Sequence, residues 1–164
     1  MSRIGGCKAR ANGEIFEGLI ERACFRYKNL GLAYVEKTPE PTKPIKSLKA
    51  GQFVTVFTKQ AQPDYKGTLK GGRAVVFEAK HTASGRIEQS RVTPEQTAAL
   101  NIHAFMGAQC FVLVSFGFEA FYRVPWEIWR DMPEKFGKVS ANQKDLAQWK
   151  VDILHFLDGL EVRA

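Results

Sequence analysis

A Gly-Gly pair at positions 71–72 separates two runs with strand character, and it constrains the fold more than any other feature of the sequence. The runs cover residues 64–70 and 73–80. Because both glycines tolerate positive φ angles, the pair predicts a tight turn, and the runs predict the two strands of a β-hairpin. With the turn at the glycines, we expect Asp64 to lie opposite Ala79.

The second run ends in Glu78-Ala79-Lys80, and alternation places Glu78 and Lys80 on one face of the strand, with Phe77 and Ala79 on the other. Asp64 is expected beside Glu78 and Lys80. Two carboxylates this close repel each other unless a cation lies between them, and oxygen ligands suit Mg²⁺ or Mn²⁺. The same alternation is also typical of a solvated strand face with a weak cross-strand pair.

Helices are expected where apolar spacing coincides with capping residues. Residues 1–11 are expected to form a flexible basic arm before the first of them. The predicted helices are one that Asn12 caps and Gly31 ends, one from Thr93-Pro94 to about Met106, a short one from Pro125-Trp126 to about Met132, and one over about 141–157 behind a Ser140/Gln143 capping pair.

Further strands are expected at 32–37, 53–58, 108–116 and 120–124. Three prolines make the region 38–62 an extended excursion that is too small to bury a core of its own. We interpret residues 1–164 as a single domain with this insertion, and residues 81–92 as a polar loop. The order of elements predicts an α/β fold in which a mixed sheet is flanked by helices.

The basic excess of the chain lies in its first half. Residues 1–80 hold 15 Lys and Arg against 7 Asp and Glu, whereas residues 81–164 hold 9 against 10. Such asymmetry favours a polyanionic partner, and contacts to phosphates carry no sequence information. A lysine-rich run can also be an ordinary solvated face. The candidate DNA-binding residues around the site are Lys37, Lys43, Lys46, Lys49, Lys59, Lys66, Lys70 and Arg73.

Cysteine usage and hydropathy exclude two other classes of protein. Cys7, Cys24 and Cys110 form no C-x-x-C pair, so neither a disulfide scaffold nor a cysteine-rich zinc site is expected. No apolar run approaches the ~20 residues of a membrane span, and no signal peptide is visible. We expect a soluble cytoplasmic protein without a membrane partner.

His81 is expected to have a structural or DNA-backbone role.

In sequence, the chain resembles the RecU family of Holliday-junction resolvases, which belongs to the PD-(D/E)XK nuclease superfamily. The resemblance covers most of residues 12–141, and the order of the KTPEP segment, DYKG and FEAKHT is its most specific part. The matching segments are GEIFEGLIERACFRYKNLGLA, VEKTPEPTKPI, FTKQAQPDYKGTLKGGRAVVFEAKHT, the helix with Gln96, CFVLVSF and YRVPWEIWRDMPEKFGKVSA.

This resemblance implies a restriction-endonuclease-like sheet and a homodimer that nicks four-way junction DNA symmetrically with Mg²⁺, for which Mn²⁺ would substitute. It implies that Asp64, Glu78 and the Ala79 carbonyl bind the metal and that Lys80 is the catalytic lysine. The excursion corresponds to the family's stalk, which would enter the junction. A recombinase is a further candidate partner.

Glu17 and Gln96 match an acid and a glutamine of the family's sites, but each has a second interpretation. Glu17 would stabilise a helix N-terminus, and Gln96 would complete a capping box with Thr93. The chain departs from the family where Asn12-Gly13 replaces an Arg-Gly pair and where Pro63 precedes the aspartate. It is also shorter than typical cellular members, which suits a phage-encoded version.

Two other functions remain open on this sequence. One is a non-catalytic protein that binds junctions or regulates a recombinase. The other is a related nuclease that acts on forks or flaps.

Overall fold

The computed structural model describes residues 3–39, 42–47, 53–57 and 62–160, and side chains are described for residues 10–39 and 62–160. The helices and strands are α1 (Arg3–Asn29), β1 (Ala33–Lys37), β2 (Thr42–Ser47), β3 (Phe53–Phe57), β4 (Tyr65–Leu69), β5 (Ala74–Thr82), β6 (Arg86–Glu88), η2 (Gln89–Arg91), α2 (Pro94–Phe105), β7 (Gln109–Phe116), β8 (Ala120–Pro125), α3 (Trp126–Arg130), α4 (Met132–Phe136), β9 (Ser140–Asn142), η3 (Ala147–Trp149), β10 (Lys150–Val151) and η4 (Ile153–His155).

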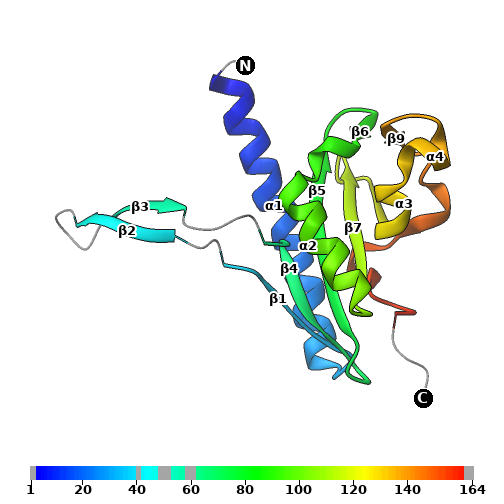
Figure 1. Cartoon of the computed structure of the whole chain (residues 1–164), viewed down its shortest axis with the longest axis horizontal. Coiled ribbons are helices and arrows are strands. Elements are labelled where there is room, and N and C mark those ends of the chain that lie inside the picture. The colour runs from blue at the N-terminus through cyan, green and yellow to red at the C-terminus, as the bar shows by residue number, and fades with distance from the viewer. Residues whose placement is uncertain (1–2, 40–41, 48–52, 58–61, 161–164) are drawn as a thin grey trace.

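A six-stranded mixed sheet forms the centre of the molecule, in the order β1-β4-β5-β7-β8-β10 (Figure 1). β5 and β7 are parallel, with Glu78 opposite Val112, and the other pairs in this sheet are antiparallel. A parallel pair needs a crossover connection, and α2 lies in the segment that supplies it. The expected mixed sheet flanked by helices is therefore confirmed.

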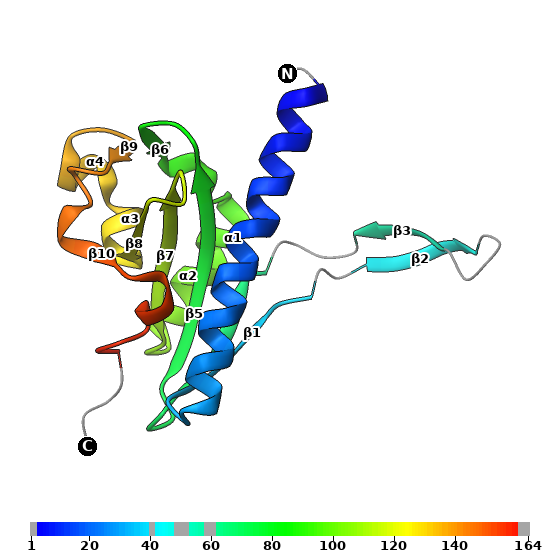
Figure 2. The ribbon, with the colours of Figure 1, turned by 180° about the vertical axis from the view of Figure 1, so that it is seen from behind.

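Helices cover the two faces of this sheet, and each face has its own apolar cluster. α1 lies along one face (Figure 2), where Phe16 and Ile20 pack with Phe77 and Leu113. On the opposite face, Leu100 of α2 packs in a cluster with Val112 and with residues of α3. Among the described residues, no helix has both the length and the apolar character that crossing a bilayer requires.

Strands β2 and β3 form a separate antiparallel pair, in which Thr42 faces Phe57 and the register shifts between Pro44 and Lys46. Figures 1 and 2 show the pair extending away from the six-stranded sheet. The expected strand over 53–58 is thus present as β3. That this segment acts as a stalk within a single domain stays a prediction.

The predicted hairpin is present as β4 and β5, but its register differs by one residue from the expected one. Tyr65 pairs with Phe77 and Thr68 with Ala74, so the position opposite Asp64 is that of Glu78 rather than Ala79. The reason is the turn, in which Leu69 N–H donates to the Arg73 carbonyl at 2.8 Å. Lys70 therefore joins the two glycines, whose φ angles are positive, in a three-residue loop.

The first helix begins earlier than predicted, because α1 starts at Arg3 and Asn12 lies inside it rather than capping it. An ion pair between Arg10 and Glu14, four residues apart, spans Asn12 and supports the helical conformation there. The predicted end is confirmed. Gly31 has φ 66°, and Leu32 N–H donates to the Tyr27 carbonyl at 3.0 Å, as in a Schellman motif.

Residues 81–92 are not a polar loop. β5 continues to Thr82, and β6 pairs with β9, which lies far away in the sequence. Ile87 is buried at the centre of β6 and anchors the segment to the core. An isolated apolar residue in a polar stretch gives no periodic signal, so this short strand escapes pattern analysis.

The helix expected over 141–157 is absent, and β9, η3, β10 and η4 occupy the region instead. Side chains bind the backbone there and compete with helix formation. The Asn142 Oδ1 atom accepts hydrogen bonds from the N–H groups of Lys144 and Asp145 at 2.9 and 3.0 Å. Gln143 does not complete a capping box, because its Oε1 accepts from the Tyr122 hydroxyl at 3.2 Å.

Candidate active site

The candidate site lies beside the part of β5 that extends past the first residue of β4. Asp64 immediately precedes β4, and its backbone carbonyl accepts a hydrogen bond from Thr38 N–H at 2.8 Å. Its side-chain Oδ2 accepts from Ala79 N–H at 2.9 Å. The carboxylate thus takes the place that a strand partner would have on this edge of β5, and this fixes its position beside the strand.

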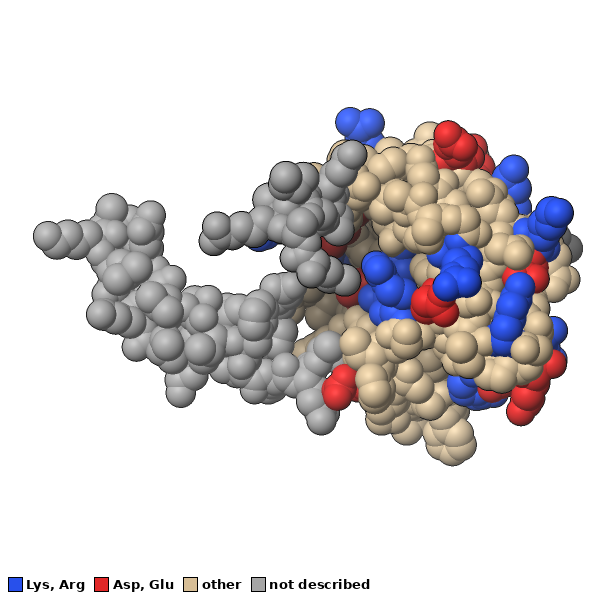
Figure 3. Space-filling view, turned by 90° about the horizontal axis from the view of Figure 1, so that it is seen from above, with Lys and Arg blue, Asp and Glu red and all other residues tan. Residues whose placement is uncertain are grey.

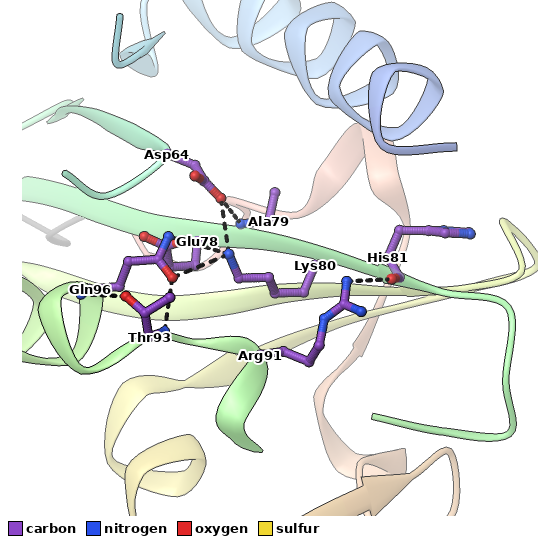
Figure 4. A network of polar contacts seen from close by, with 8 residues as sticks. All are labelled: Asp64, Glu78, Ala79, Lys80, His81, Arg91, Thr93 and Gln96. Atoms are coloured by element: carbon purple, nitrogen blue, oxygen red, sulfur yellow. Dashed lines mark hydrogen bonds and ion pairs between the residues drawn. The ribbon is translucent and has the colours of Figure 1, made fainter. Parts of the chain in front are cut away.

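Glu78 and Lys80 extend from one face of β5 and meet the Asp64 carboxylate (Figure 4). Lys80 Nζ lies 2.8 Å from Glu78 Oε2 and 3.7 Å from Asp64 Oδ2. The exposed fractions of the side chains are 0% for Glu78, 13% for Lys80 and 32% for Asp64. The three groups predicted to converge are therefore brought together, with the glutamate innermost and the aspartate nearest to solvent.

Gln96 connects the first turn of α2 to this cluster. Its backbone N–H donates to Thr93 Oγ1 at 3.3 Å, and its Oε1 accepts from Thr93 N–H at 3.1 Å, so the predicted capping box is confirmed. Its Nε2 donates to Glu78 Oε2 at 2.6 Å, and Lys80 Nζ donates to its Oε1 at 3.5 Å. The capping interpretation is therefore confirmed, and the same side chain also contacts the buried glutamate, while a role of Gln96 in catalysis stays a prediction.

Burial, and after it the nearby Asp64 charge, raise the pKa of Glu78 from its usual 4.5 to about 8, against the opposite effect of Lys80. Glu78 Oε1 is buried and has no hydrogen-bond partner in the part of the chain whose side chains are described. One buried lone-pair site therefore remains unused while the other oxygen is fully engaged. Such an atom needs either a proton or a cation.

A divalent cation fits this donor set. In a strand, the N–H and C=O of one residue point to the same edge, so the Ala79 carbonyl lies on the edge where its N–H binds Asp64. Asp64, Glu78 and this carbonyl supply oxygen ligands of the kind that Mg²⁺ prefers. Within the described residues, no group of three or more His, Cys, Asp or Glu side chains is placed to hold a metal. A bound ion would therefore rely on the backbone oxygen and on water.

Glu17 does not join this cluster by any direct contact. Its Oε2 accepts from Lys37 Nζ at 2.7 Å, and this hydrogen bond raises the pKa of Lys37. Because α1 begins at Arg3, Glu17 lies in the middle of the helix, and the interpretation as an N-terminal charge is wrong. The Asp64 charge also raises the Lys37 pKa, so this lysine is close enough to Asp64 to sense its charge.

Among the predicted DNA-binding residues whose side chains are described, Lys37 lies near Asp64, whereas Lys66 and Arg73 bind groups outside the site. Lys66 Nζ donates to Gln62 Oε1 at 2.9 Å, and Arg73 Nε donates to the Gly107 carbonyl at 3.2 Å. Lys70 lies in the hairpin turn, at the end of β4 and β5 away from Asp64. Side chains outside the described set are those of Lys43, Lys46, Lys49 and Lys59.

Two further residues, His81 and Arg91, lie next to the site. The His81 ring lies on the face opposite Lys80, where Nδ1 is 3.1 Å from Ser115 Oγ and the ring stacks on Phe118 with centroids 4.2 Å apart. This packing supports a structural role. Arg91, which sequence reasoning missed, donates from Nη2 to the His81 carbonyl at 3.4 Å (Figure 4). Its position two residues before a helix cap gave no signal of this contact.

Comparison with known proteins adds a family match that covers most of the chain. The model of the family described as RecU, Recombination protein U, matches residues 11–156. Among solved structures, Hjc from Archaeoglobus fulgidus, a Holliday junction resolvase from an archaeal hyperthermophile, has 14% sequence identity and a TM-score of 0.49, covering 83% of this chain and 95% of its own. No curated protein sequence matches significantly.

Proposed function

The chain belongs to the RecU family of Holliday-junction resolvases, as the match over residues 11–156 shows, and we propose that it cuts four-way DNA junctions with a divalent cation held by Asp64 and Glu78. The observation that carries this proposal is the convergence of the two carboxylates and Lys80 at the free edge of β5. The buried Glu78 Oε1 has no hydrogen-bond partner among the side chains that the structure describes, and this supports the cation.

The residues of the chain would act in distinct ways on a phosphodiester. Asp64, Glu78 and the Ala79 carbonyl would hold Mg²⁺, for which Mn²⁺ would substitute. When bound, the ion polarises a phosphoryl oxygen and lowers the pKa of water. The Lys80 ammonium, kept in place by Glu78 at 2.8 Å, would orient the attacking water or stabilise negative charge that develops on the phosphate.

Symmetric cleavage needs a second copy of the site. A four-way junction presents two equivalent strands, and a two-fold symmetric homodimer would place one site on each. We therefore propose that the protein acts as a homodimer and makes paired nicks. Analytical ultracentrifugation of the free protein and of its junction complex tests the dimer, and an intact monomer in both samples would contradict it.

The direct test of the reaction is a cleavage assay on an immobile four-way junction, a fork and a linear duplex of matched length, each titrated with Mg²⁺ and Mn²⁺. We expect cation-dependent cutting of the junction, and little cutting of the other two substrates. Preferential cutting of the fork would assign the protein to a different nuclease class. Tight junction binding without any cutting, at all concentrations of both metals, would favour a non-catalytic regulator.

A further inference from the structure

The free edge of β5 carries more than the candidate metal ligands. The Thr82 carbonyl accepts a hydrogen bond from Gly117 N–H at 2.9 Å, so it points toward the side of the sheet where β7 and β8 lie. Carbonyls alternate along a strand, and those of Ala79 and His81 therefore point to the opposite, free edge. The two carbonyls are separated by about 7 Å, the rise of two residues. This edge of β5 consequently presents two backbone carbonyl oxygens in succession, those of Ala79 and His81.

Arg91 occupies the second position. Its Nη2 reaches the His81 carbonyl at 3.4 Å, and within residues 10–39 and 62–160 the five donors of this group make no other hydrogen bond. No Asp or Glu pairs with Arg91 within the described part of the chain. Its side chain is exposed. Most of its donors and its full charge are thus available to an anion.

The backbone that carries Arg91 is tied to the candidate site. Arg91 ends η2, and two residues later Thr93 caps α2, whose Gln96 holds Glu78 at 2.6 Å. Figure 4 shows Arg91, Thr93 and Gln96 arranged in sequence along the same side of β5 as Lys80. The backbone of Arg91 is therefore positioned relative to the carboxylates, and its side chain reaches the His81 carbonyl from there.

The surface next to Arg91 contains a hollow that carries basic, acidic and hydroxyl side chains. A hollow of about 340 Å³ beside Arg91 is also lined by Thr82, Ser84, Arg86, Ile87 and Glu88. Arg86 pairs with Glu88 at 3.0 Å, so its charge is already balanced. Figure 3 views the end of the molecule where β5 ends, and basic side chains are spread over it among acidic ones.

We propose that Arg91 binds a backbone phosphate of the strand being cut, next to the phosphate at the Asp64 and Glu78 site. This inference rests on the proposed function, because it takes the ligand to be the same DNA strand. A guanidinium binds a phosphate through two parallel N–H donors, and Arg91 has donors to spare. The offset of about 7 Å along the edge assigns it to a neighbouring phosphate rather than the reacting one.

The test measures binding separately from cutting. Junction affinity is determined over a series of KCl concentrations for Asp64→Asn, and for Asp64→Asn combined with Arg91→Ala, Arg91→Lys or Arg130→Ala. Arg130 is the matched control, since its charge is already paired with Asp131 at 2.7 Å. We expect Arg91→Ala to weaken binding about tenfold at low salt and to reduce the salt slope by about 0.9, the loss of one phosphate contact. Arg91→Lys should restore the slope, and Arg130→Ala should leave it unchanged.

Neutral methylphosphonates, placed one at a time around the cutting position, locate the contact. One substitution should weaken binding of the Asp64→Asn protein about tenfold and have no further effect when Arg91 is also Ala. An equal penalty in both proteins at every position, or an unchanged salt slope, would overturn the assignment of Arg91. If instead these results hold while the wild-type protein never cuts a junction, the phosphate site stands and the proposed function fails.

Discussion

Gln96 Nε2 donates a hydrogen bond of 2.6 Å to Glu78 Oε2, and thereby links the capped end of α2 to the innermost carboxylate of the candidate site. Glu78 is fully buried, so its orientation depends on the groups that contact it. A partner that orients a metal ligand typically contributes 10- to 100-fold to metal affinity. We therefore expect the capping box to have a functional consequence as well as a structural one.

Gln96→Met tests this link, because it removes the three polar contacts of the side chain, to Thr93 N–H, Glu78 and Lys80, while the Thr93 hydroxyl continues to cap the helix. We expect the Mg²⁺ concentration for half-maximal junction cutting to rise about 10- to 100-fold, with a decrease in stability of about 1 kcal/mol. Metal titrations of the nicking rate and thermal melts measure the two effects. A lower melting temperature with an unchanged Mg²⁺ requirement would show that Gln96 serves the fold alone.

The pKa of Glu78 predicts how stability depends on pH in the cation-free protein. Because this pKa is raised to about 8 from 4.5, the folded state keeps a proton that the unfolded state has released. The wild type therefore loses stability as pH rises from about 5 to about 8. Glu78→Gln cannot lose this proton, so its melting temperature relative to the wild type should increase over that window and level off above it. Melts in EDTA would contradict the raised pKa if the difference were constant with pH.

The same proton competes with a metal ion for Glu78. Cation binding should release a proton below about pH 8, and the affinity for Mg²⁺ or Mn²⁺ should rise with pH up to that point. Isothermal titration calorimetry in two buffers of different ionisation enthalpy measures the proton count. The number of protons released is compared with that of Asp64→Asn, in which Glu78 is the remaining carboxylate of the site. A proton count of zero at pH 6.5 would contradict competition at this residue.

Glycine positions test the fold with opposite signs. A Cβ at Gly67 would lie 2.2 Å from the Tyr34 carbonyl oxygen and 2.6 Å from Val35 Cα, so Gly67→Ala should force β1 and β4 apart and lower stability by several kcal/mol.

Gly13 lies inside α1 with nothing within 4 Å of an added Cβ. Gly13→Ala should therefore stabilise the protein by about 0.5–1 kcal/mol. Urea unfolding measures both, and an unchanged stability of Gly13→Ala would argue that residue 13 does not lie in the helix interior.

The sequence predicts those parts of the site that local rules determine. Asp64, Glu78 and Lys80 converge because a glycine turn defines a hairpin and because side chains alternate along a strand. The predicted register of the β4–β5 hairpin was wrong by one residue, since the sequence does not reveal whether Lys70 ends a strand or joins the turn. The capping box of α2 was predictable because both of its residues lie within four positions.

Contacts between segments that lie far apart in the sequence could not be predicted from these local rules. The 2.6 Å bond from Gln96 to Glu78 and the position of Arg91 at the His81 carbonyl depend on how α2 crosses the sheet. The helix predicted over 141–157 failed for a different reason. Asn142 and Asp145 bind nearby backbone groups, and these side-chain contacts outcompete a pattern that otherwise suits a helix.

The central claim is tested most directly by comparing Asp64→Asn with the wild type on an immobile four-way junction in Mg²⁺, with the cuts mapped on all four strands. We predict that the wild type makes two symmetric nicks, and that the variant binds the junction with similar affinity and makes none. Equal cutting by both proteins would contradict the assignment of Asp64, and with it the proposed site at the free edge of β5.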